Sequence, residues 1–280
     1  MSRSYVLMTA MPPTKGHMRL IQFAAKVGTS AEVIVATQPD EPYSFERVQA
    51  LHDATKDMNV NIHHIHKELP QEPEVAVGFW DMWLDFLLMF GLQSEDFIVA
   101  SEMYGAKLAE ISGATFVPYD VDRELYHSKA TEVRDHPIYN FDQILPEFQK
   151  YLMKRVTIFG AESTGKTTLS NNLRRDDGLG AHWLFEYARP YLEKCGTEIT
   201  TESMTAIWRG QKALQEHSES FMDMPFIIQD TDLFSTVGYW DFWDMNTPPA
   251  LVEDAIRLKS DLYLITQSNI PFEEDPIRYG

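Results

Sequence analysis

Residues 160–167 read GAESTGKT and fit the pattern G-x-x-x-x-G-K-[ST] at every fixed position. The apolar run Val156–Phe159 precedes this stretch, and a helical pattern over Lys166–Leu173 follows it. Glycines in such a loop let backbone N–H groups turn toward phosphate oxygens, and the next helix directs the positive end of its dipole at them. The stretch therefore predicts a strand, a phosphate-binding loop and a helix, and a chance glycine-rich turn is the weaker alternative.

Two side chains of this loop predict phosphoryl transfer. Lys166 would reach the β- and γ-phosphates of a nucleotide, and the Thr167 hydroxyl would ligate Mg²⁺. The residues that we assign to ATP binding in this loop are Gly160, Glu162, Ser163, Thr164, Gly165, Lys166, Thr167 and Thr168.

Charged residues elsewhere in the second half are candidates for the same site. Asp230 follows an apolar strand expected over Pro225–Gln229, where a second Mg²⁺ ligand or a catalytic base would lie, and Asp232 comes two residues later. A solvated turn is the alternative for these acids, because Asp is common in turns. Glu186 and Arg189 lie one helical turn apart, and a surface ion pair is as good an interpretation of them as a functional pair.

The first half of the chain alternates short apolar runs with helical patterns. This alternation predicts right-handed crossovers and a parallel sheet covered on both faces. The ligands of such sheets bind beyond the carboxyl ends of the strands, which here means residues 11–17 and 101–105. The expected strands are Tyr5–Ala10, Glu32–Thr37, Val60–Ile65, Phe97–Ala100 and Thr115–Pro118, and the expected helices are His17–Val27, Phe45–Lys56, Val75–Phe90 and Gly105–Ile111.

A second α/β unit is expected after a closing helix over Phe141–Leu152. Arg155–Phe159 begins a new strand, and further strands are expected over Pro225–Gln229 and Leu262–Ile265. We therefore expect two α/β domains, each built on a parallel sheet, at residues 1–152 and 153–280.

Two short patterns mark a second phosphate site in the first domain. Thr14-Lys15-Gly16-His17 follows the first strand and opens a helix, so Gly16 permits close backbone approach and His17 can donate to a phosphate. Further on, Thr131 and Arg134 stand one helical turn apart and form a possible phosphate clamp. Each pattern alone is weak, because the first is usually only a turn and the second only a helix cap with a surface cation.

Together the two patterns resemble the adenylyltransferases, whose signatures are [HT]-x-G-H and I-S-x-T-x-x-R. Thr14, Gly16 and His17 match the first signature, and Thr131 and Arg134 match the second. The resemblance is incomplete: Ser128 and Lys129 stand where the second signature has Ile and Ser, and Met8 and Ala10 replace a glycine and an aromatic residue of the longer first signature.

The order of motifs over almost the whole chain resembles one family more closely. Besides the patterns above, the matching segments are residues 101–105 (SEMYG), 121–123 (VDR), 186–189 (EYAR), 230–232 (DTD) and 269–280. The family is the bifunctional nicotinamide-mononucleotide adenylyltransferase/ribosylnicotinamide kinase family, the NadR-like enzymes.

This resemblance implies a Rossmann-like nucleotidyltransferase fold followed by a P-loop kinase fold. It implies phosphorylation of ribosylnicotinamide with ATP and Mg²⁺, and then adenylyl transfer from ATP to nicotinamide mononucleotide, giving NAD and pyrophosphate. The catalytic residues that it implies are His17, Arg134, Lys166 and Asp230, with Thr167 and Asp230 as the Mg²⁺ ligands. The binding residues that it implies for ATP and the mononucleotide are Thr14, Lys15, Gly16, His17, Ser101, Glu102, Tyr104, Arg123, Thr131 and Arg134, and those for the nucleoside are Glu186, Arg189, Asp230 and Asp232.

The ends of the chain differ from the family pattern. Members with a repressor role carry a helix-turn-helix before the first strand, so we expect that role to be absent here. The family continues beyond the position of Gly280 with a basic lid, so we expect an incomplete kinase domain.

Two other functions stay open on the sequence. The first is an adenylyltransferase that uses another phosphorylated acceptor; Trp80 and Trp83 could stack on a nicotinamide ring, but tryptophans in an apolar helix are more often core residues. The second is a regulator that binds ATP and NAD without turnover.

Composition narrows the partners and the compartment. A formal net charge of -18 argues against a general grip on nucleic acid, although a few buried cations can still hold a phosphate. Cys195 is the single cysteine, and the apolar stretch Trp80–Leu92 contains Asp81 and Asp85 and so cannot span a bilayer. With no signal peptide in view, we expect a cytoplasmic protein that binds small-molecule nucleotides but neither nucleic acid nor membrane; homo-oligomers remain possible.

Overall fold

The computed structural model describes residues 2–70, 77–125, 127, 129–174, 180–219, 223–269 and 271. The chain divides into two compact units, residues 1–151 and 152–280. Each unit is an α/β structure, and every pairing between its described strands is parallel. The prediction of an α/β fold with two parallel sheets is therefore confirmed.

The sheet of the first unit has the strand order β3-β2-β1-β4-β5. The strands predicted from the sequence are all present with small shifts at their ends. The first strand stops at Met8, because Ala10 adopts a φ of 48°, a left-handed backbone that cannot continue a strand. The strands are β1 (Ser4–Met8), β2 (Ala31–Thr37), β3 (Val60–His66), β4 (Phe97–Ala100) and β5 (Thr115–Pro118).

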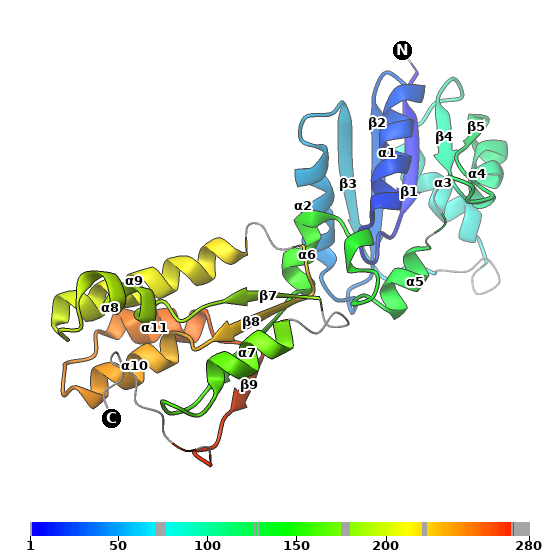
Figure 1. Ribbon diagram of the computed structural model, residues 1–280. Coiled ribbons are helices and arrows are strands. Elements are labelled where there is room, and N and C mark those ends of the chain that lie inside the picture. The colour runs from blue at the N-terminus through cyan, green and yellow to red at the C-terminus, as the bar shows by residue number, and fades with distance from the viewer. Residues whose placement is uncertain are drawn as a thin grey trace. The chain divides into compact units, whose positions relative to one another are not determined.

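Helices cover this sheet on both faces, because side chains alternate along each strand. Tyr5, Ile34 and Ile98 pack with Trp83 and Leu108 in one core cluster. That cluster lies under α3 and α4, while α1 packs against β1 and β2 (Figure 1). The helices are α1 (Lys15–Val27), α2 (Ser44–Thr55), α3 (Phe79–Met89), α4 (Tyr104–Ser112) and α5 (Ala130–Asp135).

The two tryptophans considered for ring stacking belong to this core. Trp83 is 7% exposed, and Trp80 packs against the cluster from the same helix. The helix was predicted over Val75–Phe90; its described part begins at Phe79, and residues 75 and 76 lie outside the described residues.

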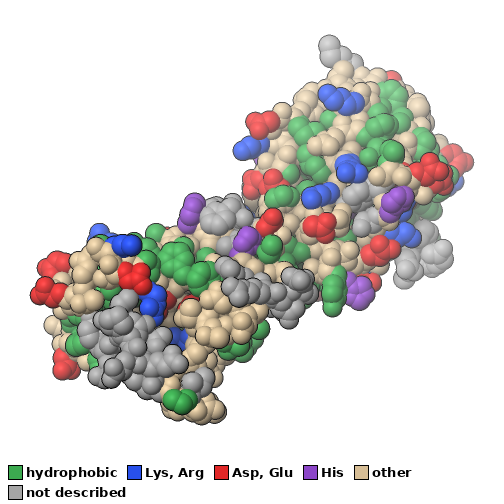
Figure 2. Space-filling view, viewed as in Figure 1, with side chains coloured by type: hydrophobic (Ala, Val, Ile, Leu, Met, Phe, Trp, Pro, Cys, Tyr) green, Lys and Arg blue, Asp and Glu red, His purple; other side chains and the backbone are tan. Residues whose placement is uncertain are grey.

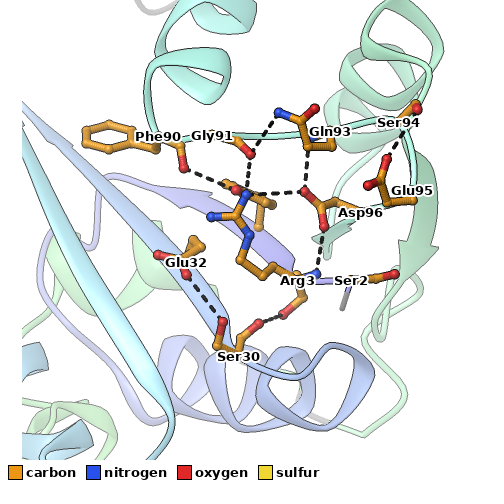
Figure 3. Close-up of polar contacts among 12 residues, drawn as sticks. Ser2, Arg3, Ser30, Glu32, Phe90, Gly91, Gln93, Ser94, Glu95 and Asp96 are labelled. Carbon is orange, nitrogen blue, oxygen red and sulfur yellow. Dashed lines mark hydrogen bonds and ion pairs between the residues drawn. The ribbon is translucent and has the colours of Figure 1, made fainter.

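Polar contacts of Arg3 fasten the amino end of β1 to the segment before β4 (Figure 3). The Asp96 carboxylate accepts hydrogen bonds from the backbone N–H of Arg3 at 2.7 Å and of Gln93 at 2.9 Å. The Arg3 guanidinium donates to the carbonyl of Gly91. These hydrogen bonds join the start of β1 to the residues just before β4, and all of their partners lie in the first unit.

The closing helix predicted over Phe141–Leu152 is wrong in its first half. A 3₁₀ turn at Phe141–Gln143 ends before the helix α6 begins at Pro146 (Pro146–Leu152). The proline has no backbone N–H and disfavours a helical conformation in the preceding residue, so the helix is interrupted before Pro146. Ile144 instead bridges Thr14, and the Leu145 N–H donates to the Pro13 carbonyl at 3.0 Å, which holds the loop before α1 in place.

The sheet of the second unit has the order β7-β8-β6-β9. The strand β7 was not predicted, because its four residues are too few to show the alternation that marks a strand. The strands are β6 (Lys154–Phe159), β7 (Ala181–Leu184), β8 (Phe226–Asp230) and β9 (Leu262–Ile265).

The helices of the second unit lie against its sheet and in a group beside it, and α9 contacts β7. The helix α7 contacts β6, β7 and β8. The other helices share a core cluster that includes Leu192, Ile207, Leu233 and Trp240, on the side toward which β7 and β8 point (Figure 1). The helices are α7 (Lys166–Arg174), α8 (Ala188–Cys195), α9 (Thr201–Ser218), α10 (Leu233–Phe242) and α11 (Pro249–Arg257).

The described surface carries charges of both signs. On the face in Figure 2, Lys and Arg side chains lie singly among acidic ones, and those described form no continuous basic area. Within the described ranges, no helix has the length and apolar character that crossing a membrane requires.

Candidate functional site

The predicted phosphate loop lies between the central strand β6 and the helix α7. Gly160 has a φ of 152°, and a Cβ built on it would stand 2.2 Å from the Thr266 hydroxyl oxygen, so only glycine fits there. The Thr164 and Thr266 hydroxyls are 2.6 Å apart and hydrogen-bonded, and the Thr266 N–H donates to the Phe159 carbonyl at 2.9 Å. The loop is thus held by Thr266, the residue after the neighbouring strand β9, as well as by its connection to β6.

The two residues predicted to bind Mg²⁺ are in direct contact. Thr167 Oγ1 donates to Asp230 Oδ2 at 2.5 Å, so the first turn of α7 is joined to the end of β8. Asp230 is 2% exposed and ends its strand, as the sequence predicted. The Lys166 ammonium lies at the same loop and donates to the Ala161 carbonyl at 2.8 Å.

This donor set suits a hard divalent cation that shares its coordination with phosphate. Mg²⁺ prefers oxygen ligands and commonly takes one or two carboxylates together with substrate phosphates and water. A hydroxyl and a carboxylate meet that need beside a phosphate loop. Among the described residues, no three or more His, Cys, Asp or Glu side chains are grouped so that they could hold a metal ion by themselves.

A cavity of about 130 Å³ opens beside this loop. Its walls include the loop residues from Glu162 to Thr168 together with Glu186 and Arg189. Burial raises the pKa of Glu186, and the nearby Asp230 charge raises it further, while Lys166 and Arg189 act in the opposite direction. The structure therefore brings together the loop and the Glu186–Arg189 pair, which are separated in sequence.

Much of the cavity wall was missed by sequence reasoning. The apolar wall comes from α8, α9 and the segment between them, and a polar and aromatic wall comes from α10. The α9 residues recur with helical spacing, which on a sequence is indistinguishable from an ordinary core face. The missed lining residues are Ala188, Leu192, Ile199, Met204, Ile207, Gln211, Thr231, Ser235, Thr236, Tyr239 and Trp243.

Asp232 occupies a different place from its predicted partner Asp230. It caps α10, since its Oδ1 accepts from the Phe234 N–H at 3.0 Å, and its Oδ2 accepts from the Tyr263 hydroxyl at 2.6 Å. Burial raises the pKa of this carboxyl. Both oxygens thus hold the fold, and Asp232 is not among the residues that line the cavity.

The first unit has its own cavity, of about 290 Å³, beyond the carboxyl ends of β1, β4 and β5. It joins the start of α1, the segment after β4, the segment after β5 and the start of α5. Tyr119 and Asp120 directly follow β5. Because parallel strands present their carboxyl ends at one edge of the sheet, this position could have identified them as cavity-lining residues. The predicted residues that line it are Thr14, Gly16, His17, Ser101, Glu102, Arg123 and Thr131, and the residues missed are Leu20, Tyr119, Asp120, Lys129 and Ala130.

His17 is held in one tautomer by a reciprocal capping arrangement at the start of α1. The backbone N–H of Thr14 donates to His17 Nδ1 at 3.0 Å, so Nδ1 is an acceptor and a neutral ring carries its proton on Nε2. Burial lowers the pKa of His17 to about 4, and the Arg123 charge contributes in the same direction. The ring is therefore a neutral N–H donor near pH 7.

Other predicted residues of the first unit lie apart from this cavity. The side chains of Lys15 and Arg134 are exposed and are not among its lining, and Arg134 lies 3.9 Å from the Asp135 carboxylate. Tyr104 is turned inward: its hydroxyl donates to the Leu7 carbonyl at 2.6 Å and so ties α4 to β1. Ser128 lies outside the described residues.

The fold and the two cavities define an α/β protein of two units, the second of them of the P-loop type. The sequence model of a family described as an AAA domain matches residues 155–279.

The chain is homologous to NadR over nearly its whole length. The trifunctional NAD biosynthesis/regulator protein NadR of Salmonella typhimurium is 23% identical, and the match covers 95% of this chain and 69% of that protein. The protein of the same name from Escherichia coli strain K12 matches with the same identity and coverage.

Solved NadR structures share the fold. A NadR protein in complex with NR superposes with a TM-score of 0.65 at 22% identity, covering 94% of this chain and 79% of that one. A NadR protein in complex with NAD and AMP-PNP gives a TM-score of 0.66 at 22% identity, covering 95% and 81%.

Proposed function

We propose that this protein makes NAD in two steps, one in each unit. Residues 153–280 transfer the γ-phosphoryl group of ATP to ribosylnicotinamide, and residues 1–152, as a Rossmann-like nucleotidyltransferase, join the resulting mononucleotide to the AMP part of ATP. The observation that carries the proposal is the gathering, in each unit, of motif residues from distant parts of the chain around one cavity at the carboxyl edge of a parallel sheet. Homology to proteins named for NAD biosynthesis and regulation supports it.

In the kinase step the phosphate loop positions ATP and neutralises its charge. Lys166 and the loop N–H groups hold the β- and γ-phosphates. Thr167 and Asp230 would hold Mg²⁺, which would supply positive charge to neutralise the phosphates. The acceptor lies in the cavity with its hydroxyl toward Glu186 and Arg189. Its oxygen forms a bond to the γ-phosphorus as the bond from that phosphorus to the β-phosphate oxygen breaks. The hydroxyl proton passes to the facing Glu186 carboxylate, and ADP leaves.

In the adenylyl-transfer step the protein forms no covalent intermediate. A phosphate oxygen of the mononucleotide attacks the α-phosphorus of ATP in line, and the bond to the β-phosphate oxygen breaks to release pyrophosphate. The Nε2–H of His17 donates to the phosphate chain, and Arg123 adds positive charge in the same cavity. Catalysis then rests on positioning and on preorganised donors.

A direct assay tests the proposal. The full chain is incubated with ATP, Mg²⁺ and either ribosylnicotinamide or a panel of phosphorylated acceptors, and ADP, pyrophosphate and NAD are measured. NAD formation from nicotinamide mononucleotide, with pyrophosphate released in equal amount, is the expected result. Nucleotide binding without turnover would instead indicate a sensor, and turnover only with another acceptor would reassign the substrate.

A further inference from the structure

A buried amide in the cavity of the second unit has an unused donor. Gln211 is 3% exposed and lines the cavity from α9. Its Oε1 accepts from the Tyr187 backbone N–H at 3.0 Å, whereas its Nε2 is buried and makes no hydrogen bond to any described residue. Since a buried donor left unmet is costly, such groups are rare and call for an explanation. A molecule in the cavity is the natural partner for this N–H.

The orientation of this amide is fixed by its neighbour. An N–H can donate only to the oxygen of the amide, so the contact with Tyr187 places Oε1 on the backbone and leaves Nε2 as the remaining group. Gln211 can therefore offer the cavity a donor and not an acceptor.

The position of Gln211 along the cavity indicates which part of an acceptor it meets. Tyr187 follows Glu186, which lines the cavity together with the phosphate-loop residues Lys166 and Thr167, so this is the phosphoryl-transfer end. On α9, Ile207 and Met204 continue the same face away from Gln211 as an apolar wall. A nucleoside with its reacting hydroxyl at the first end and its ring against the second places its sugar beside Gln211.

A second buried atom in the cavity favours a sugar over a phosphate. Glu162 Oε2 is buried and has no hydrogen-bond partner among the described residues, while its Oε1 accepts from the Tyr239 hydroxyl at 3.2 Å. A fully ionised phosphate offers only acceptors and so has no donor for this carboxylate oxygen. A sugar hydroxyl can both accept from an amide N–H and donate to a carboxylate.

We infer that Gln211 is a specificity-determining residue whose side-chain N–H donates to a ring hydroxyl oxygen of the ribose in the phosphoryl acceptor. The inference rests on the proposed kinase function and deepens it: the cavity selects ribonucleosides over their deoxy counterparts through this contact.

The test compares kcat/KM for ribosylnicotinamide with kcat/KM for its 2′-deoxy and 3′-deoxy analogues. The wild type is expected to prefer the ribonucleoside over one of these analogues by about 10-fold or more, because the analogue leaves the buried N–H unmet. In Gln211→Met that preference falls to near unity while the KM for ATP is unchanged. Gln215→Met is the matched control: Gln215 is fully buried one turn further along α9 but does not line the cavity, so the wild-type preference persists.

A second variant covers loss of the Tyr187 contact. Gln211→Glu keeps an oxygen for the Tyr187 N–H but removes the amide donor, and at pH 8 it is expected to lose the preference as well. A folded, active Gln211→Met or Gln211→Glu protein that keeps the wild-type preference would overturn the role of Gln211 but leave the proposed kinase function intact. A wild type that phosphorylates no ribonucleoside would overturn the proposed kinase function, and the assignment with it.

Discussion

Replacing Gly210 with alanine tests how α9 supports the residues that face the acceptor cavity. A Cβ built on Gly210 would stand 2.0 Å from Cε1 and 2.2 Å from Cζ of the Tyr187 ring. Carbon atoms in contact normally lie about 3.5–4.0 Å apart, so the ring must move by about 1.5 Å. Tyr187 adjoins Glu186 and bonds to Gln211, both of which line the cavity, and its displacement therefore disturbs the site.

Two opposing contributions set the change in stability. Alanine in a helix interior is more favourable than glycine by about 1 kcal/mol. Forcing an extra carbon into a packed position costs about 1–3 kcal/mol, and a contact of 2.0 Å belongs at the upper end. We therefore expect Gly210→Ala to lower the free energy of unfolding of the second unit by about 1–2 kcal/mol. The KM for the nucleoside should rise more than the KM for ATP.

Gly238→Ala provides the control. Gly238 lies inside α10, and a Cβ there would meet no atom within 4 Å, so only the helix propensity changes and the variant should gain about 0.5–1 kcal/mol. Urea unfolding followed by tryptophan fluorescence is the assay, and the second unit contains Trp183, Trp208, Trp240 and Trp243. Equal stabilisation by the two substitutions would refute the close packing of Gly210 on Tyr187.

Three further predictions concern the two phosphate sites. His17→Ala should lower the rate of NAD formation by about 10²–10³ through loss of one preorganised donor, with ribosylnicotinamide phosphorylation unchanged; near-normal adenylyl transfer would remove His17 from the site. Lys166→Ala should abolish phosphorylation but not adenylyl transfer, and loss of both activities in a folded protein would contradict one site per unit. Because burial lowers the pKa of His17 from 6.5 to about 4, the unfolded chain binds more protons between these values, so stability should fall as the pH falls through that window and be level above it. Relative to His17→Asn, wild-type stability should drop by about 2 kcal/mol from pH 7 to pH 5 in urea unfolding, and an equal change in both proteins would contradict a His17 ring that stays neutral in the folded state.

Sequence patterns predicted those parts of the fold that depend on neighbouring residues. The strand before Gly160 and the helix from Lys166 follow from local periodicity and from the backbone needs of a phosphate loop. The break before Pro146 could have been anticipated from the proline alone, but the pairing of Ile144 with Thr14 could not, because it depends on tertiary contact.

The candidate sites were predictable to a smaller extent. Residues at the ends of strands, such as Asp230 and Ser101, could be placed because parallel strands present their carboxyl ends together. Gln211 could not be distinguished from the buried Gln215 one turn away, since both occupy one face of a helix and only the packing decides which of them reaches the cavity.

The hydrogen bond between the Thr164 and Thr266 hydroxyls has a consequence for the order in which the two units fold during synthesis. Its partners are separated by 102 residues, so the bond can form only after β9 has been synthesised and has paired with β6. The contacts that shape the cavity of the first unit, by contrast, are complete within residues 1–151. During translation the first unit can therefore acquire its ligand-binding form while the ribosome is still producing the second, whose phosphate loop gains this hydrogen bond only after Thr266 has been synthesised.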